Sequence, residues 1–282
     1  MKTVFFAMTA GGGLLLLLLC PSAAAEGARA GLSLTAQVLL PSLFPFMVLT
    51  DMLTGSPLPG TERRTVSFFL GFSGGYPTGT RLICGLYSAG RISRTEAEWR
   101  LGWCSNCGIG FLFGTVSAGL LGRPALGLPL LFVQALSALC CALLLRPPRC
   151  TPSPVSVPAA AGEGLSAAVF RAAKSMAGVG GGVIFISALL SAAESLLPPL
   201  PPLVSALLRG ACELSLGARA AAALPECEVL LSSVCAFGGL CVHLQCLGFI
   251  SAAGLSPRRY FAGKTLQALL AGFFAFVLRF CW

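Results

Sequence analysis

Residues 68–119 read FFLGFSGGYPTGTRLICGLYSAGRISRTEAEWRLGWCSNCGIGFLFGTVSAG, which is two apolar runs joined by a basic turn. The first run is interrupted at its centre by Gly74, Gly75 and Pro77. Each half is then too short to cross a bilayer by itself, because a spanning helix needs about 20 residues. The first run therefore predicts a re-entrant hairpin.

The second run is broken by polar and flexible residues at its centre. Ser105 and Asn106 lie there between glycines. Irregular backbone at membrane depth is tolerated only where protein or a water-filled cavity receives it. Two neighbouring broken elements are the best sign in a sequence of the substrate site of a secondary transporter. We therefore expect a transport site between these two runs.

Four motifs carry a resemblance to known membrane proteins. They are SGGYPTGTRL (73–82), GRISRTEAE (90–98), CSNCGIGFLFGTVSAG (104–119) and FGGLCVHLQ (237–245). They resemble the nucleoside-recognition or Gate domain of several membrane families, and more closely the sporulation integral membrane proteins of the SpoVV/YlbJ type. The resemblance covers about residues 43–267. It implies export of dipicolinate, a small aromatic dicarboxylate, from the mother cell toward the forespore.

Composition independently indicates a multi-pass membrane protein. The 282 residues are 56% hydrophobic and 10% charged, whereas soluble domains are about 25% charged. The net charge is +9, but the basic residues lie between apolar segments and not on one face. This distribution argues against nucleic-acid binding. Most of the 13 cysteines lie in apolar runs, so we expect no disulfide framework. The pair Cys104 and Cys107 has redox or metal-binding spacing, but we expect it to be structural.

The expected fold class is all-α, with about seven transmembrane helices and two re-entrant hairpins in two inverted repeats. The expected spans are residues 1–25, 32–52, 97–121, 125–145, 170–197, 228–252 and 261–282, and the hairpins are residues 68–90 and 203–224. The expected division is an N-terminal signal-anchor-like helix (1–31), a first Gate-like repeat (32–146), a linker (147–164) and a second repeat (165–282). We expect the first helix to be retained, the alternative being a cleaved signal peptide.

Two observations favour the inverted repeat. Sliding the halves past each other places Gly79 on Gly217 and Gly108 on Gly238. With re-entrant hairpins, thirteen basic residues, Arg100 and Lys264 among them, fall on one side of the membrane and five on the other. The positive-inside rule then places the larger group, with the N-terminus, in the cytoplasm.

The candidate substrate site combines small and polar residues of both halves. The first half supplies Ser73, Gly74, Gly75, Thr78, Thr80, Arg81, Ser105 and Asn106, and the second supplies Glu213, Ser215, His243 and Gln245. An anion in a low-dielectric cavity needs positive potential, which half-helix N-termini at the breaks can supply. We therefore expect an anionic small-molecule substrate.

Four of the charged or titratable residues allow alternative interpretations. Arg81 suits a carboxylate, or it snorkels to the surface. His243 is a satisfied core residue or a ligand or proton carrier. Glu213 is the acidic counterpart of His243 or pairs with Arg209. For Asp51 we prefer an interfacial charge to an ion site.

Other classes of function are less well supported. The sequence has a single histidine, and it shows neither a Ser-His-Asp arrangement nor a cluster of several metal ligands. Both observations argue against an enzyme, and we expect no metal and no cofactor. The alternatives to dipicolinate export are a nucleoside carrier and a non-transporting scaffold that binds other sporulation membrane proteins. The expected location is the cell membrane, specifically the outer forespore membrane if the host sporulates, with lipid around the bundle.

Overall fold

The computed structural model describes residues 2–55, 64–147 and 164–279, and these residues form helices and no strands. The elements before residue 148 are α1 (Lys2–Leu19), α2 (Pro21–Leu34), η1 (Thr35–Leu39), α3 (Leu40–Gly55), α4 (Arg64–Gly74), α5 (Thr78–Ser88), α6 (Arg94–Cys104), η2 (Phe111–Leu120), η3 (Pro124–Leu126) and α7 (Gly127–Leu144). Those after residue 163 are α8 (Leu165–Ser195), α9 (Pro202–Cys212), α10 (Leu214–Ala222), α11 (Glu228–Phe237), α12 (Gly239–Ala252) and α13 (Arg258–Leu278).

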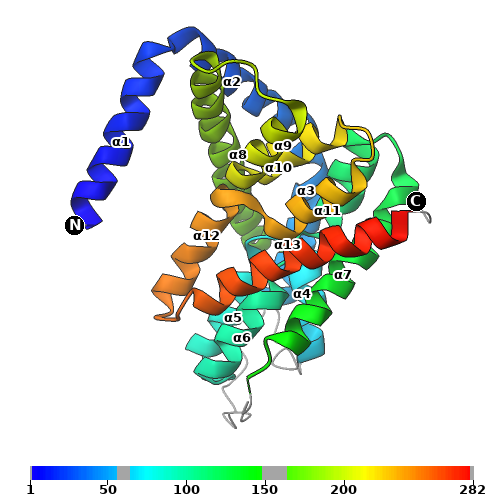
Figure 1. The fold of residues 1–282 in the computed structure, drawn as a ribbon. Helices are drawn as coiled ribbons and strands as arrows, with labels where there is room; N and C mark the ends of the chain where they lie inside the picture. The colour runs from blue at the N-terminus through cyan, green and yellow to red at the C-terminus, as the bar shows by residue number, and fades with distance from the viewer. Residues whose placement is uncertain (1, 56–63, 148–163, 280–282) are drawn as a thin grey trace.

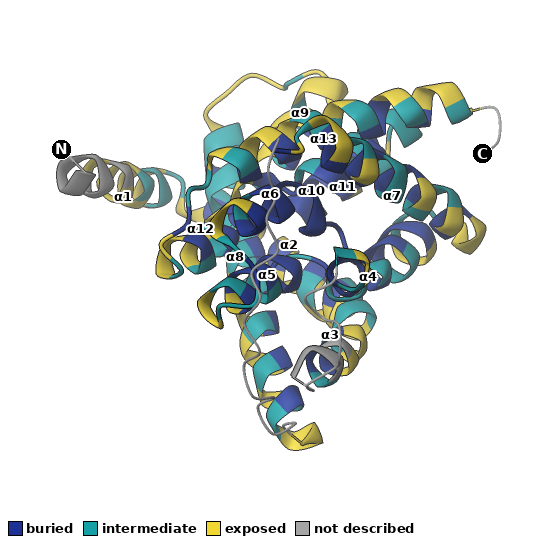
Figure 2. Cartoon of the chain, turned by 90° about the horizontal axis from the view of Figure 1, so that it is seen from below, coloured by how far each residue is buried: buried dark blue, intermediate teal, exposed yellow. Residues whose placement is uncertain are grey.

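Five helical stretches of the described residues are long and apolar enough to cross a membrane. They are Pro21–Leu49, Pro124–Leu144, Leu165–Ser195, Glu228–Ala252 and Arg258–Leu278. Their outward faces carry large apolar side chains, for example Leu143 and Phe170, and Figure 2 shows the buried residues gathered at the centre of the bundle. Apolar residues inside and outside are typical of a helix bundle in lipid. The chain is thus a multi-pass, all-helical membrane protein, while seven spans and re-entrant hairpins stay predictions.

The helices break where the sequence predicts. α4 ends at Gly74 and α5 begins at Thr78, with Gly75 in the left-handed region at φ 65°. α6 ends at Cys104, and helix resumes only after residue 108. In the second half, α9 and α10 meet at an extended Glu213, and α11 and α12 meet at Gly238, whose φ is 94°. Each half therefore contains a broken hairpin followed by a broken helix.

The expected boundary between the first two spans is wrong. The sequence predicts a helix end and a loop for most of residues 21–34. In the structure these residues form α2, which continues through η1 into α3. The break lies at Cys20, where φ is −127° and ψ is 56°. Pro21 favours the first helical position, and the alanines that follow it are strong helix formers. The linker expected at residues 147–164 lies almost wholly outside the described residues.

The long helices frame the broken elements. α2 and α3 pack along α8, and α13 packs between α6, α7 and α11 (Figure 1). α1 extends away from the bundle at one end of α2 (Figure 1). Helices from the two ends of the sequence thus enclose the four breaks.

Glycines allow the two halves of each hairpin to touch. A Cβ atom on Gly79 would overlap the carbonyl oxygen of Cys104 and lie 3.3 Å from the Cα of Gly71. A Cβ atom on Gly217 would lie 2.6 Å from the backbone nitrogen of Gly210. Gly79 and Gly217, the pair aligned from the sequence, therefore hold the same place in their hairpins. The inverted relation of the two halves stays a prediction.

We expect Gly79→Ala to lower the free energy of unfolding by about 1–2 kcal/mol, because the added methyl group meets backbone that cannot rotate away. The matched control is Gly85→Ala in the same helix, where a Cβ atom meets nothing within 4 Å. Its helix propensity should leave stability unchanged or slightly raised. Thermal unfolding in detergent measures both variants, and equal midpoints would contradict the close approach.

Candidate functional site

A pocket lies where the four broken elements meet. About 650 Å³ in and around it is free of protein atoms, a figure that includes the open space at its mouth. Its lining residues are Leu43, Phe46, Met47, Ser73, Gly74, Gly75, Tyr76, Cys107, Gly108, Gly110, Phe111, Val179, Glu213, Leu214, Ser215, Cys241, Val242 and Gln245. Both halves of the chain therefore contribute to one mostly apolar pocket with a few polar groups.

The beginnings of several half-helices border this pocket. Phe111 begins η2, Leu214 begins α10, and Cys241 lies in the first turn of α12. Tyr76 lies just before α5. A helix N-terminus carries partial positive charge and unsatisfied N–H groups. The surroundings of the pocket consequently favour negative charge without a cation among the residues that line it.

Half of the residues predicted for the site line the pocket. They are Ser73, Gly74, Gly75, Glu213, Ser215 and Gln245. The backbone at Gly75 passes very close to the break after α6. A Cβ atom on Gly75 would lie 2.7 Å from the backbone nitrogen of Gly108. The first hairpin and the first broken helix thus share one crossing point at the wall of the pocket.

Glu213 has a local role at the start of α10. Its carboxylate accepts a hydrogen bond from the backbone N–H of Leu216 at 2.8 Å. The predicted pairing of Glu213 with Arg209 is wrong, because the guanidinium of Arg209 bonds to Glu194 at 2.6 Å. A carboxylate at the N-cap is favoured by the helix dipole, which explains why Glu213 can be buried.

The other half of the predicted set lies outside the pocket lining. These residues are Thr78, Thr80, Arg81, Ser105, Asn106 and His243. The hydroxyls of Thr80 and Ser105 bond to each other at 2.8 Å, which ties α5 to the break after α6. The amide of Asn106 donates to the carbonyl of Trp103 at 2.7 Å. Asn106 therefore satisfies a backbone carbonyl at its own break, and Ser105 links that break to α5.

A buried lysine behind the pocket is absent from the predicted site. Lys264 of α13 is 0% exposed, and its ammonium donates to the carbonyl of Ser105, to the side-chain oxygen of Gln267 and to the hydroxyl of Tyr76. Gln267 in turn donates to the side-chain oxygen of Asn106 at 2.8 Å. The assignment of Lys264 to the cytoplasmic surface is thus wrong, because its side chain points into the bundle.

Arg81 pairs with a carboxylate and does not reach the pocket. Its guanidinium bonds to Asp51 of α3, which is buried, and Arg171 of α8 lies 3.8 Å from the same carboxylate. Asp51 follows the candidate span Pro21–Leu49, so the interfacial role preferred for it stays a prediction. The three residues join the first hairpin to helices of both halves.

His243 lies among aromatic rings. Its Nδ1 atom and the hydroxyl of Tyr260 are 2.9 Å apart, and the rings of Phe237, Tyr260 and Phe261 surround it. Its Nε2 atom is buried and has no hydrogen-bond partner. No contact joins it to Glu213 among the interactions of the described residues, and both interpretations of this histidine stay predictions.

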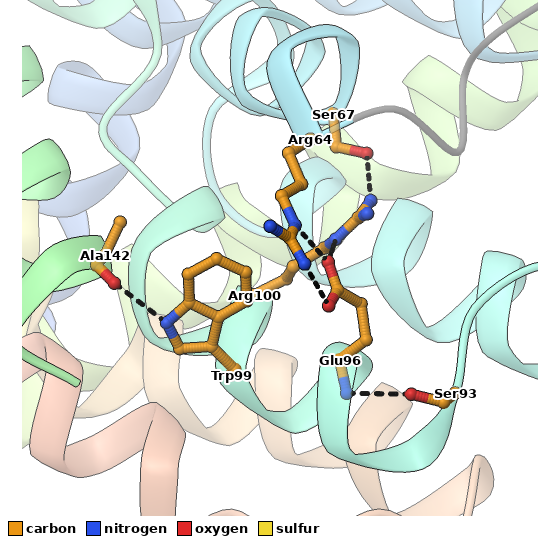
Figure 3. A network of polar contacts seen from close by, with 7 residues as sticks. All are labelled: Arg64, Ser67, Ser93, Glu96, Trp99, Arg100 and Ala142. Atoms are coloured by element: carbon orange, nitrogen blue, oxygen red, sulfur yellow. Dashed lines mark hydrogen bonds and ion pairs between the residues drawn. The ribbon is translucent and has the colours of Figure 1, made fainter. Parts of the chain in front are cut away.

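A second ion cluster stabilises the start of α6 (Figure 3). The carboxylate of Glu96 accepts from Arg64 at 2.7 and 2.9 Å and from Arg100 at 2.8 Å, and Arg100 also donates to Ser67 at 3.0 Å. Arg64 lies over the ring of Trp99, whose indole N–H donates to the carbonyl of Ala142 at 3.0 Å. Arg100, assigned to the cytoplasmic surface from the sequence, is therefore buried in a structural cluster.

The cysteines that the structure describes are free thiols, and Cys104 and Cys107 are both buried. Within residues 2–55, 64–147 and 164–279, no group of three or more His, Cys, Asp or Glu side chains is placed to hold a metal ion. The pair Cys104 and Cys107, at the break after α6, therefore packs as two small apolar side chains.

Comparison with known proteins supports the resemblance found in the motifs. The chain is 24% identical over 320 aligned residues to the sporulation integral membrane protein YlbJ of Bacillus subtilis (strain 168). The alignment covers 92% of this chain and 78% of that protein. No family profile matches the chain, and no solved structure matches it. The predicted resemblance to proteins of the YlbJ type is thereby confirmed.

Proposed function

We propose that this protein exports dipicolinate from the mother cell across the outer forespore membrane. The relative with which it aligns is a sporulation integral membrane protein. The resemblance of the motifs to the SpoVV/YlbJ type implies an aromatic dicarboxylate as substrate. The observation that carries the proposal is the pocket formed by broken elements of both halves. Binding sites of secondary transporters are commonly built from such discontinuous helices.

The chemistry of the pocket suits this substrate class. Phe46, Phe111 and Tyr76 provide aromatic surface for a flat ring. The half-helix N-termini that border the pocket provide N–H donors for carboxylate oxygens. The proposal assigns no chemical reaction to the protein, and dipicolinate would cross unchanged.

Transport into inside-out vesicles tests the proposal. We expect vesicles that contain the wild-type protein to accumulate labelled dipicolinate and to ignore uridine supplied in parallel. Ser73→Leu should reduce uptake to the level of empty vesicles, since the larger side chain fills the pocket. The matched control is Ser88→Leu at the exposed end of α5, which should transport normally.

The alternatives give different results in the same assay. Accumulation of uridine alone would favour a nucleoside carrier. Failure of the folded, inserted wild-type protein to accumulate either compound would favour the scaffold.

A further inference from the structure

Lys264 is a cation without a carboxylate partner among the described residues. Its ammonium bonds to a backbone carbonyl, an amide oxygen and a phenol hydroxyl, all of them neutral. An ammonium withdrawn from water and not paired with an anion is costly inside a membrane protein, and such residues usually mark substrate or ion pathways. The charge of Lys264 is thus only partly compensated in this structure.

The neighbourhood explains how the lysine is tolerated. Ser105 caps the C-terminal end of α6, where the helix carries partial negative charge. Lys264 Nζ also lies 5.3 Å from the centre of the Tyr76 ring. These groups hold the ammonium in place without neutralising its charge.

Tyr76 connects this lysine to the pocket. The residue lines the pocket, and its hydroxyl lies 3.2 Å from Lys264 Nζ and donates to the carbonyl of Ala236 at 2.8 Å. Among the described lining residues, Glu213 is the one that carries a formal charge, and this charge is negative. An anion in the pocket therefore needs a positive charge from outside the lining, and Lys264 is next to it.

We propose that Lys264 supplies the positive charge that makes this pocket select anions, acting from behind Tyr76, which lines the pocket and accepts a hydrogen bond from the lysine. The inference deepens the proposed function and rests on it, because it takes the pocket to be the substrate site. A lysine that only stabilised the break after α6 would affect folding and would not distinguish charged from neutral ligands. Charge selectivity is therefore the property to measure.

The test is calorimetric titration of the purified full chain with three ligands. They are dipicolinate (pyridine-2,6-dicarboxylate), phthalate, and the neutral pyridine-2,6-dicarboxamide. The wild type should bind the two dicarboxylates more tightly than the diamide. Lys264→Met should weaken dicarboxylate binding about 10- to 100-fold, because the bound anion loses a nearby unit charge in a site of low dielectric constant, and leave diamide binding unchanged. Dicarboxylate binding that is unaffected by the substitution overturns the inference.

Tyr76→Phe provides a second variant if Lys264→Met does not fold. It keeps the aromatic ring and removes the hydroxyl that accepts a hydrogen bond from Lys264. We expect the preference for dicarboxylate over diamide to fall about tenfold. A preference equal to that of the wild type contradicts the inference, since a purely structural network would leave selectivity intact.

The three ligands, together with the transport assay, also separate this inference from the proposed function. Lys264-dependent binding of phthalate, without binding or transport of dipicolinate, sustains the anion site and removes the assigned substrate. Transport of dipicolinate that survives Lys264→Met with unchanged affinity sustains the function and overturns the inference. A wild type that binds neither dicarboxylate contradicts both.

Discussion

Replacing Glu96 by alanine is expected to lower the free energy of unfolding by about 3–5 kcal/mol, the range for breaking a buried ion pair from one side. Glu96 and Arg100 are 5% and 4% exposed, and the carboxylate of Glu96 bonds to both Arg100 and Arg64 (Figure 3). Without it, Arg100 keeps its hydrogen bond to Ser67 but loses the carboxylate that compensates its charge. A marginally stable protein would lose most of its folded population.

The measurement is the thermal midpoint of the detergent-purified protein, together with the fraction that elutes as a monodisperse peak. Glu226→Ala is the control, because the side chain of Glu226 is 84% exposed and lies 3.8 Å from Arg279. Such an exposed pair should contribute almost nothing. If Glu96→Ala unfolds with the same midpoint as Glu226→Ala, the cluster does not hold α6.

The breaks in the helices were predictable because they depend on local chemistry. Gly74, Gly75 and Pro77 end one helix and begin the next here, since glycine permits a positive φ and proline lacks an N–H group. Gly238 likewise has a positive φ. The residues of 68–119 and 237–245 thus indicate three of the four breaks, while the break at Glu213 lies outside them.

The role of Lys264 was not predicted because basic residues close in sequence do not always share an environment. Lys264 follows Arg258 and Arg259 at the start of a span, so counting charges places all three at the surface. A signal was nevertheless present. Tyr260, Lys264 and Gln267 recur at helical spacing in an apolar segment, which puts three polar side chains on one buried face.

The pairing of Arg81 likewise depends on a distant segment. Asp51 lies 30 residues earlier in the chain and meets Arg81 only because α3 packs beside the first hairpin. A sequence pattern can indicate that an arginine in an apolar helix needs an anion. It cannot decide whether that anion is a substrate or another side chain, and a double substitution can.

We expect Arg81→Ala to lower the free energy of unfolding by about 3 kcal/mol, because buried Asp51 loses the guanidinium that bonds to it, while Arg171 stays at 3.8 Å. The value lies at the low end of the range for buried pairs, since the Arg81 side chain is 29% exposed. Adding Asp51→Ala should recover at least half of the loss, because it removes the buried charge. Arg219→Ala, at an exposed arginine of α10, is the matched control and should cost little.

Dipicolinate uptake by the same variants then decides what Arg81 does. If the arginine serves Asp51, uptake should fall in Arg81→Ala and return in the double variant along with the thermal midpoint. If the arginine binds the substrate, as its position in an apolar helix first indicates, the double variant will be stable and will not transport. Recovered stability without recovered uptake would thus assign Arg81 to the substrate site. The first hairpin would then have to change its contacts with α3 when the substrate enters.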